Sequence, residues 1–581
     1  MSSAVNLECK KLCMFRCLYA VGLSIAMQYL LLTIFLLFVN FDIFHPITWI
    51  ATTFRLMYSF YTWLSIMPLI SSVIVFGILL GKSFLSVKKY YATRFRWFFG
   101  TALRKFTFLG IHLMVGFLTA WLYARFLHPD YRTLLLPYFD REVINSRYTF
   151  LVFIGISSGF YFFAKENLKN ESEIEFPIIQ EKKFIKIRSL VYSILYTSLV
   201  KSLVPTLCFA FVYWIIGNSL NRALANSFGS EIDETYNSLF TIFTSPRMLF
   251  YAWILCSQIL SNMELMRHFF SFLLAEEMHF VVEKNPVVAA SQTEVSLVEA
   301  LALKEVPVVQ QMACLDLYNL SSAKAVKRRL EVFALSIPGG HPYNWNQLSG
   351  QCLSLINEFT EELASSVKKI STMKNPPPFA QLKPSASETA ERILLRQYNE
   401  TYGIRRMMAD PVEQPQPACG TSGQSNNPCD RVNEILENIQ KSIEESAKAA
   451  FYAVPGVFYL FGEQDGAKTA FVLSNSQAIV WLTQGLAGIC ASSLHEDKYG
   501  VVQNELSKII KSLLKLKLEL DKLNNVNLNG KKLDRNLITL KNAVKRSLYR
   551  ICTVFGDYMR DLVDEQDDLR NLQCFLSYQE T

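Results

Sequence analysis

The run CLYAVGLSIAMQYLLLTIFLLFVNF, residues 17–41, contains no charged residue and lies between Arg16 and Asp42. The hydrocarbon layer of a bilayer is about 30 Å thick, and a helix needs roughly 20 apolar residues to cross it. A helix also satisfies every backbone polar group where no water is present. Because the run is too long for the apolar part of a cleavable signal peptide, we expect it to remain in the protein as a membrane-spanning helix.

Five further apolar runs follow in the first half of the chain. They cover residues 56–81, 106–124, 148–164, 202–220 and 248–263. The fifth run follows Lys201, so residues 189–200 are expected to approach along the membrane interface while this lysine reaches toward the headgroups. The sixth run is short and spans only with little tilt or local thinning of the bilayer. Residues 265–275 are a second candidate for an interfacial segment.

The positive charges between these runs alternate between high and low numbers. Lys and Arg number three in residues 1–16, one in 42–55, seven in 82–105, four in 125–147, six in 165–188 and two in 222–247. Loops rich in Lys and Arg stay on the cytosolic side of a membrane. We therefore expect a cytosolic N-terminus at residues 1–16, six spans within residues 17–275, and a C-terminal half on the cytosolic side.

The C-terminal half has the periodicity of helices in contact with water. Apolar residues recur every three or four positions from Leu506 to Leu523, with lysines on the opposite side. We expect one helical segment at 276–373, a Pro-rich mobile linker at 374–430, and a second helical segment at 431–581. The predicted fold is all-α: a six-helix transmembrane bundle followed by a mostly helical cytosolic domain.

Few residues suggest chemistry. The seven histidines do not occur at metal-ligand spacing, and the twelve cysteines include no Cys-x-x-Cys pair, so we expect no metal site. Nucleotide-binding glycine patterns are absent, so no cofactor is expected. The net charge of +8 is modest and lies in loops beside apolar runs, which indicates membrane topology and not nucleic-acid binding.

One catalytic-looking motif lies in the fourth run. Gly155 and Gly159 enclose Ser157 in the pattern of a hydrolase nucleophile elbow, which requires a strand–turn–helix setting. The same spacing of glycines lets two membrane helices approach closely. We favour helix packing at Gly155 and Gly159 over a hydrolase built on Ser157.

Two further features have alternative interpretations. Cys9, Cys13 and Cys17 share one helix face beside basic residues, where either palmitoylation or an unmodified thiol surface is reasonable. His112, inside the third run, is either a proton-relay residue or a partner in a hydrogen bond between helices. A transporter or channel remains the alternative class of protein, and it predicts polar groups that converge inside the bundle.

Several stretches, in order along the chain, resemble a known family. They are Asp42-Ile43-Phe44-His45-Pro46-Ile47 with Trp49, Phe176–Gln180, Phe333–Pro342 with Asn344-Trp345, Trp481 with Gly485-Leu486, Glu496–Gln503, Tyr549-Arg550-Ile551 and Phe555-Gly556. Together they resemble the transmembrane nucleoporins of the nuclear-division-cycle family. The linker is shorter than in many members, so nothing is transferred onto it.

The resemblance implies a protein without catalytic activity that anchors the nuclear pore complex in the nuclear envelope and supports pore assembly and insertion. It implies six spans with both termini on the cytosolic or pore side, and some protein in the endoplasmic reticulum. The implied partners are other nucleoporins, among them the WD-repeat nucleoporin Aladin and the membrane-associating inner-ring nucleoporin with an RNA-recognition fold. It also leaves room for self-association.

The family-like stretches of the C-terminal half have two interpretations: a turn between helices or a contact with a partner. The candidate residues are Pro338, Gly339, Gly340, His341, Pro342, Trp345, Trp481, Glu496, Asp497 and Gly500. Proline fixes φ and glycine permits unusual backbone angles, which favours a turn before Trp345. A buried Trp345 would support the turn. At 496–503 we likewise expect a turn between helices, with Gly500 ending the first helix.

Overall fold

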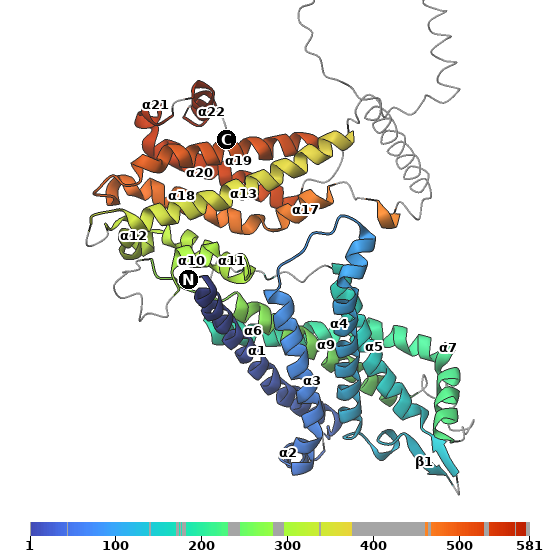
Figure 1. Cartoon of the computed structure of the whole chain (residues 1–581). Coiled ribbons are helices and arrows are strands. Elements are labelled where there is room, and N and C mark those ends of the chain that lie inside the picture. Colours follow the sequence, from blue (N-terminus) through green and yellow to red (C-terminus); the bar gives the residue numbers. More distant parts are fainter. Residues whose placement is uncertain are drawn as a thin grey trace, which may run out of the picture.

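The computed structural model is helical in nearly all of the residues that it describes. These are residues 2–42, 44–138, 141–169, 174, 176, 182–230, 245–282, 295–335, 339–374, 459–462, 466–527, 534–563 and 565–576. Pro338 and the proposed linker, apart from Lys374, lie outside the described residues. Within them the chain forms an apolar helical bundle and a C-terminal body that lies at one end of that bundle (Figure 1).

The bundle is built from the first half of the chain, and its long helices overlap the expected spans. The span expected at 17–41 runs two residues past the end of α1, and the one expected at 56–81 begins in α2 and continues in α3. Its helices are α1 (Ser2–Val39), α2 (Pro46–Met57), α3 (Phe60–Leu85), α4 (Arg94–Ala124), α5 (Ser146–Lys169), α6 (Lys183–Lys201), α7 (Leu203–Phe228) and α9 (Pro246–Leu274). A hairpin of β1 (Leu135–Tyr138) and β2 (Arg141–Ile144), with the short η1 (Pro129–Tyr131) before it, joins α4 to α5. The hairpin and α2 lie at the end away from the C-terminal body (Figure 1).

Length and hydropathy select six helices of the described chain as able to cross a membrane. They are Val5–Val39, Phe60–Leu85, Arg94–Ala124, Ser146–Asn167, Lys183–Phe228 and Ser476–Glu496. Five of them contain expected spans. The sixth lies in the C-terminal body, whereas α9, which contains residues 248–263, is not among them.

The reason for this difference is the position of α9. Helices α1, α5 and α6 pack around α9, and most of its side chains from Tyr251 to Leu274 are buried, while the others are half-buried. A helix enclosed by other helices does not face lipid, so it tolerates polar residues such as Gln258 and Asn262. Residues 265–274 belong to the same buried helix.

The fifth apolar run lies in α7, and Ser202 joins α7 to the preceding helix α6. Residues 189–200 lie in α6 and pack on the bundle, where Ile194 contacts Met27 and Phe269. The indole Nε1 of Trp253 donates a hydrogen bond to the carbonyl of Leu199 at 3.0 Å and so ties the end of α6 to α9.

Helices α4 and α5 approach so closely that their backbones touch. A Cβ atom on Gly159 would lie 2.4 Å from the carbonyl oxygen of His112, and one on Gly155 would lie 2.6 Å from the carbonyl oxygen of Gly116. No real Cβ atom sits so close to a backbone oxygen. The glycines therefore permit this contact, as small residues do between membrane helices.

The C-terminal body is one helical unit with a shared core. Its elements are α10 (Leu297–Ala302), α11 (Pro307–Leu320), η2 (Ala323–Ala325), α12 (Val326–Phe333), α13 (Tyr343–Lys374), α17 (Ala467–Ser474), α18 (Ser476–Glu496), α19 (Gln503–Asn527), α20 (Arg535–Phe555), η4 (Gly556–Tyr558), α21 (Met559–Leu562) and α22 (Gln566–Leu576). Helix α18 packs between α11 and α20, which explains its apolar composition without a membrane. Helix α13, before the proposed linker, packs on α17, α18 and α19 after it.

Replacing Gly159 by alanine should force α4 and α5 apart. Overpacking of this kind costs about 1–3 kcal/mol, so we expect a lower thermal unfolding midpoint for the full chain in detergent. Gly110→Ala is the matched control on α4, because a Cβ there meets nothing within 4 Å. Equal midpoints for the two variants would show that the close contact is not needed.

Candidate functional site

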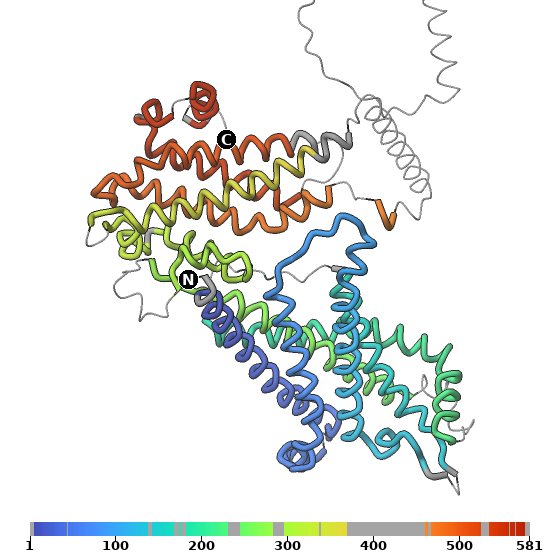
Figure 2. The backbone as a smooth tube through the Cα atoms, in the orientation of Figure 1, coloured from blue at the N-terminus to red at the C-terminus, as the bar shows by residue number. Residues whose placement is uncertain are grey.

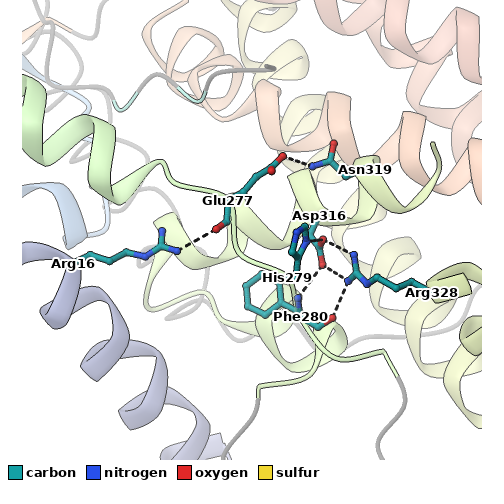
Figure 3. Close-up of polar contacts among 7 residues, drawn as sticks. All are labelled: Arg16, Glu277, His279, Phe280, Asp316, Asn319 and Arg328. Atoms are coloured by element: carbon teal, nitrogen blue, oxygen red, sulfur yellow. Dashed lines mark hydrogen bonds and ion pairs between the residues drawn. The ribbon is translucent and has the colours of Figure 1, made fainter. Parts of the chain in front are cut away.

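The place where the bundle joins the C-terminal body is the most densely bonded polar region that connects the two parts. Helix α9 ends at Leu274, and residues 275–282 leave it toward the body. Figure 3 shows the side chains that hold this segment, which come from α1, α11 and α12. We call residues 273–280 with their partners the junction.

Arg16 of α1 caps the last turn of α9. Its guanidinium donates to the carbonyl of Glu276 at 2.7 Å, to that of Glu277 at 3.4 Å, and to those of Leu273 and Leu274 at 3.5 Å. The last carbonyls of a helix have no partner within the helix and carry partial negative charge. A half-buried cation from α1 therefore lies at the end of α9, and its shortest bond, to Glu276 just past the helix, fixes α1 to the segment that leaves α9.

The side chains of the same segment bind the flanking helices. Lys183 at the start of α6 forms an ion pair of 2.5 Å with Glu276. The amide of Asn319 on α11 donates to the carboxylate of Glu277 at 2.7 Å. The segment is thus bound on one side to the bundle and on the other to the C-terminal body.

Asp316 of α11 is the buried centre of the junction. Its carboxylate accepts two bonds from Arg328 of α12, at 2.8 and 2.9 Å, and one from the backbone nitrogen of Phe280 at 3.1 Å. The ring nitrogen Nδ1 of His279 lies 3.2 Å away, and Arg328 also donates to the carbonyl of Phe280 at 2.8 Å. The hydrogen bonds with Asp316 raise the pKa of Arg328 above its ordinary value, so the guanidinium stays charged.

The first turns of α1 continue the contact, and Figure 2 shows the N-terminal end of α1 reaching the C-terminal body. Asn6 and Lys10 bind the carboxylate of Glu305, and these bonds hold its pKa below the usual range. Cys9 and Cys13 belong to the same hydrophobic core as the C-terminal body.

This burial bears on the proposed lipidation. Cys9 and Cys13 are at most 1% exposed, and the thiol of Cys17 packs against Gly81. A palmitoyl chain needs an accessible thiol that can reach the acyl donor. In this arrangement the face shared by Cys9, Cys13 and Cys17 is a packing surface between α1 and its neighbours, which favours unmodified thiols over palmitoylation.

The two basic loops of the bundle also contact the C-terminal body. Just before α4 the ring of Tyr90 lies 5.6 Å from that of Phe471 in α17, and at the start of α4 the guanidinium of Arg94 lies 3.8 Å from the ring centre of Tyr459, which precedes α17 in the chain. Between α5 and α6, Phe176 meets Trp481 of α18 edge-on at 5.8 Å. Trp481 is buried, so two of the family-like stretches meet across the interface.

The stretch from Glu496 to Gly500 forms a turn between α18 and α19. Glu496 pairs with Arg329 of α12 through two bonds of 2.6 Å. Asp497 accepts bonds from the backbone nitrogens of Tyr499 and Val502, each at 3.0 Å. Gly500 has a φ of +64° and lies within the turn, whereas α18 ends four residues earlier, at Glu496. Gly500 therefore does not end the first helix as expected; the carboxylates at 496 and 497 shape the turn.

The stretch before α13 combines an exposed turn with a buried aromatic anchor. Trp345 is fully buried and contacts Phe333, with ring centres 6.3 Å apart. Gly339 and Gly340 have φ of +118° and +63°, a region that other residues rarely adopt. His341 is exposed and Pro342 is half-buried. A buried Trp345 supports the turn interpretation for this stretch, and it leaves Gly339–His341 on the surface.

The polar side chains inside the bundle form separate groups between pairs of helices. Gln28 of α1 binds Asn262 of α9, and Tyr213 and Asn221 of α7 bind Thr149 of α5. A third group joins Lys165 of α5 to Glu264 of α9 at 3.4 Å. Among the described residues these groups tie neighbouring helices together at different places, which favours a role in helix packing over the converging polar site of a transporter.

Neither catalytic candidate has a catalytic setting. The hydroxyl of Ser157 bonds to the carbonyl of Ile154 in its own helix at 3.1 Å, without the strand of a nucleophile elbow. His112 bonds through Nδ1 to the carbonyl of Phe108 in its own helix at 2.6 Å, and its Nε2 lies 3.7 Å from the carboxylate of Glu166 on α5, so its ring also approaches the neighbouring helix. Among the described residues, no group of three or more His, Cys, Asp or Glu side chains is placed to hold a metal ion.

The sequence reasoning missed the residues that make the junction. Asp316 is the only acid in the apolar helix Pro307–Leu320, and a lone carboxylate in a buried helix needs a partner. That signal was available. Arg16, Arg328 and Arg329 read as ordinary surface or border charges, and only the fold brings them to their partners.

Comparisons with known proteins give a consistent result along the chain. The family model described as Nucleoporin protein Ndc1-Nup matches residues 11–573. A protein named Nucleoporin Ndc1 from Drosophila pseudoobscura pseudoobscura is 42% identical over 99% of this chain and 99% of its own length. The Drosophila melanogaster protein of that name is 41% identical over 98% of both chains. Nucleoporin NDC1 of Homo sapiens is 24% identical over 94% of both.

Replacing Asp316 by asparagine should loosen the junction and destabilise the C-terminal body. Removing one partner of a buried ion pair leaves the other charge uncompensated, at a cost of about 3 kcal/mol. We expect a clear fall in the thermal unfolding midpoint and faster proteolysis near residues 277–282. Glu305→Gln is the control, because that pair is exposed and should leave both measurements unchanged. Similar behaviour of the two variants would mean that Asp316 does not hold the junction.

Proposed function

The chain belongs to the Ndc1-Nup family of nucleoporins, and we propose that it anchors the nuclear pore complex in the nuclear envelope and supports pore assembly and insertion. One observation carries the proposal: a single hydrophobic core runs from Cys9 and Leu80 of the bundle into the C-terminal body. A membrane bundle packed directly on a helical body can hold that body, and whatever binds it, at the membrane surface.

The proposed topology has six spans, with both termini on the cytosolic or pore side. Segments 1–16, 82–105 and 165–188, which are rich in Lys and Arg, all contact the C-terminal body. Basic segments favour the cytosolic side. We propose that the protein resides in the pore membrane, and also in the endoplasmic reticulum, which is continuous with it.

We propose that the C-terminal body binds other proteins and does not catalyse a reaction. We propose that it binds other nucleoporins, among them an Aladin-type WD-repeat nucleoporin and the membrane-associating inner-ring nucleoporin with an RNA-recognition fold. The exposed turn at Gly339–His341 and the adjoining Tyr343 are our candidate contact, because Tyr343 is 56% exposed beside the buried Trp345. Self-association is a further contact that this surface allows.

Tagging the protein at its own locus tests the proposal. We expect a punctate signal at the nuclear rim and recovery of other nucleoporins by affinity purification. A uniform reticular signal, with no nucleoporin recovered, would refute the anchor.

The same purification tests the proposed contact. Tyr343→Ala should reduce recovery of the bound nucleoporin by roughly tenfold, because exposed aromatic residues commonly dominate binding energy. The variant should keep the wild-type unfolding midpoint. Tyr558→Ala is the matched control, since Tyr558 is equally exposed on the body, and it should bind normally. Equal recovery from both variants would exclude this turn as the contact.

A further inference from the structure

Helix α2 lies at the end of the bundle opposite the C-terminal body (Figure 1). It begins at Pro46, a residue suited to the first turn of a helix. The indole Nε1 of Trp49 donates to the carbonyl of Leu37 in α1 at 3.0 Å, and the hydroxyl of Thr62 in α3 donates to the carbonyl of Leu56 at 2.7 Å. The helix is therefore fixed to both of its neighbours.

The surface of α2 is divided into three stripes along its length. Trp49, Thr53, Leu56 and Met57 face the bundle and are buried or half-buried, whereas Thr48, Thr52 and Arg55 form an exposed polar stripe. The third stripe consists of Ile47, Ile50, Phe54 and Tyr58 at helical spacing, and these side chains are between 44% and 82% exposed. An amphipathic helix that buried its apolar residues only against protein would not need this third stripe.

The position of α2 relative to the spans indicates what covers the third stripe. Tyr58 and Ser59 alone separate it from α3, whose 26 residues make a helix of about 39 Å. That length exceeds the hydrocarbon layer of about 30 Å, so the first turn of α3 lies in the interfacial region and α2 lies at the same level. Phe41, Phe60 and Tyr61 beside it are also exposed, so the third stripe continues the lipid-facing surface of the bundle.

We propose that α2 is an in-plane membrane helix, inserted in the leaflet opposite the C-terminal body. Ile47, Ile50, Phe54 and Tyr58 lie among the acyl chains of phospholipids, and Thr48, Thr52 and Arg55 face the headgroups and water. Arg55 is the one charged side chain of the helix, and it suits a phosphate. Helices with one apolar and one polar stripe bind membranes in this way. The inference does not depend on the pore function proposed above.

Photochemical labelling from lipid tests the proposal on the full chain. The protein is placed in phosphatidylcholine vesicles that contain a phosphatidylcholine with a diazirine on its acyl chain, and the adducts are located by mass spectrometry. We expect adducts on Ile47, Ile50 and Phe54, but not on Thr48 or Thr52. In an Ile50→Asp/Phe54→Asp variant, labelling of α2 should fall by roughly tenfold or more, because carboxylates are excluded from acyl chains.

Controls separate local effects from misfolding. Thr48→Asp/Thr52→Asp places the same charges on the polar stripe and should label like the wild type. Labelling of Ile78 on α3, which is 63% exposed, should be the same in every variant and reports an intact bundle.

An unlabelled α2 beside a labelled Ile78 in the wild-type protein would overturn the proposal, even if the aspartate variant misfolds. Unchanged labelling of α2 in a folded aspartate variant would also overturn it. The same holds if α2 is labelled in vesicles but protected in native nuclear-envelope membranes, because a protein would then cover the stripe.

Discussion

The last carbonyl groups of a helix have no partner of their own, and in this protein Arg16 lies at the end of α9, 3.5 Å from the carbonyls of Leu273 and Leu274 and 2.7 Å from that of Glu276 just past the helix. Much of the structure depends on this contact, because α9 is the centre of the bundle and also the helix from which the chain passes into the C-terminal body. Arginine suits the position since it is charged at any physiological pH and its fork of donors reaches several carbonyls at once.

The residues that follow α9 extend the same constraint into the C-terminal body. Phe280 is bound through its backbone nitrogen and its carbonyl to the Asp316–Arg328 pair. Arg329, the next residue, binds Glu496 at the far end of α18. Consecutive arginines of α12 thus connect the exit of the bundle to the central helix of the body. The anchoring role that we propose would be served by such a connection, because it fixes the position of the body relative to the bundle.

The sequence predicted what depends on local composition. The spans in α1, α3, α4 and α5 are long apolar runs between charges, and the bilayer imposes that pattern wherever a helix faces lipid. The same rule fails for α9 and α18, whose surroundings are protein: α9 carries polar residues inside the bundle, and α18 is apolar because it is buried in the body. High hydropathy indicates that a helix is shielded from water. Only the fold shows whether lipid or protein surrounds it.

The junction and α2 were missed for different reasons. Arg16 and Glu276 are far apart in sequence, and no local pattern identifies such a pair. The three stripes of α2 are visible in residues 46–57 as a helical period, but charge and hydropathy alone divide this helix, because residues 42–55 count as a loop and residues 56 and 57 join the apolar run of the second span. By contrast, the close packing at the glycines of α5 and the turn before α19 depend on local backbone geometry. Glycine positions in the sequence therefore indicated where both features lie.

Amide hydrogen exchange across residues 273–282 of the full chain in a lipid nanodisc is the most direct measurement of whether the bundle and the body are firmly joined. Because Arg16, Asp316 and Arg328 bind this segment, we predict that the backbone amide hydrogen of Phe280 exchanges as slowly as the amide hydrogens in the core of α18. Exchange there as fast as in an exposed loop would contradict the connection and would make the C-terminal body a tethered domain.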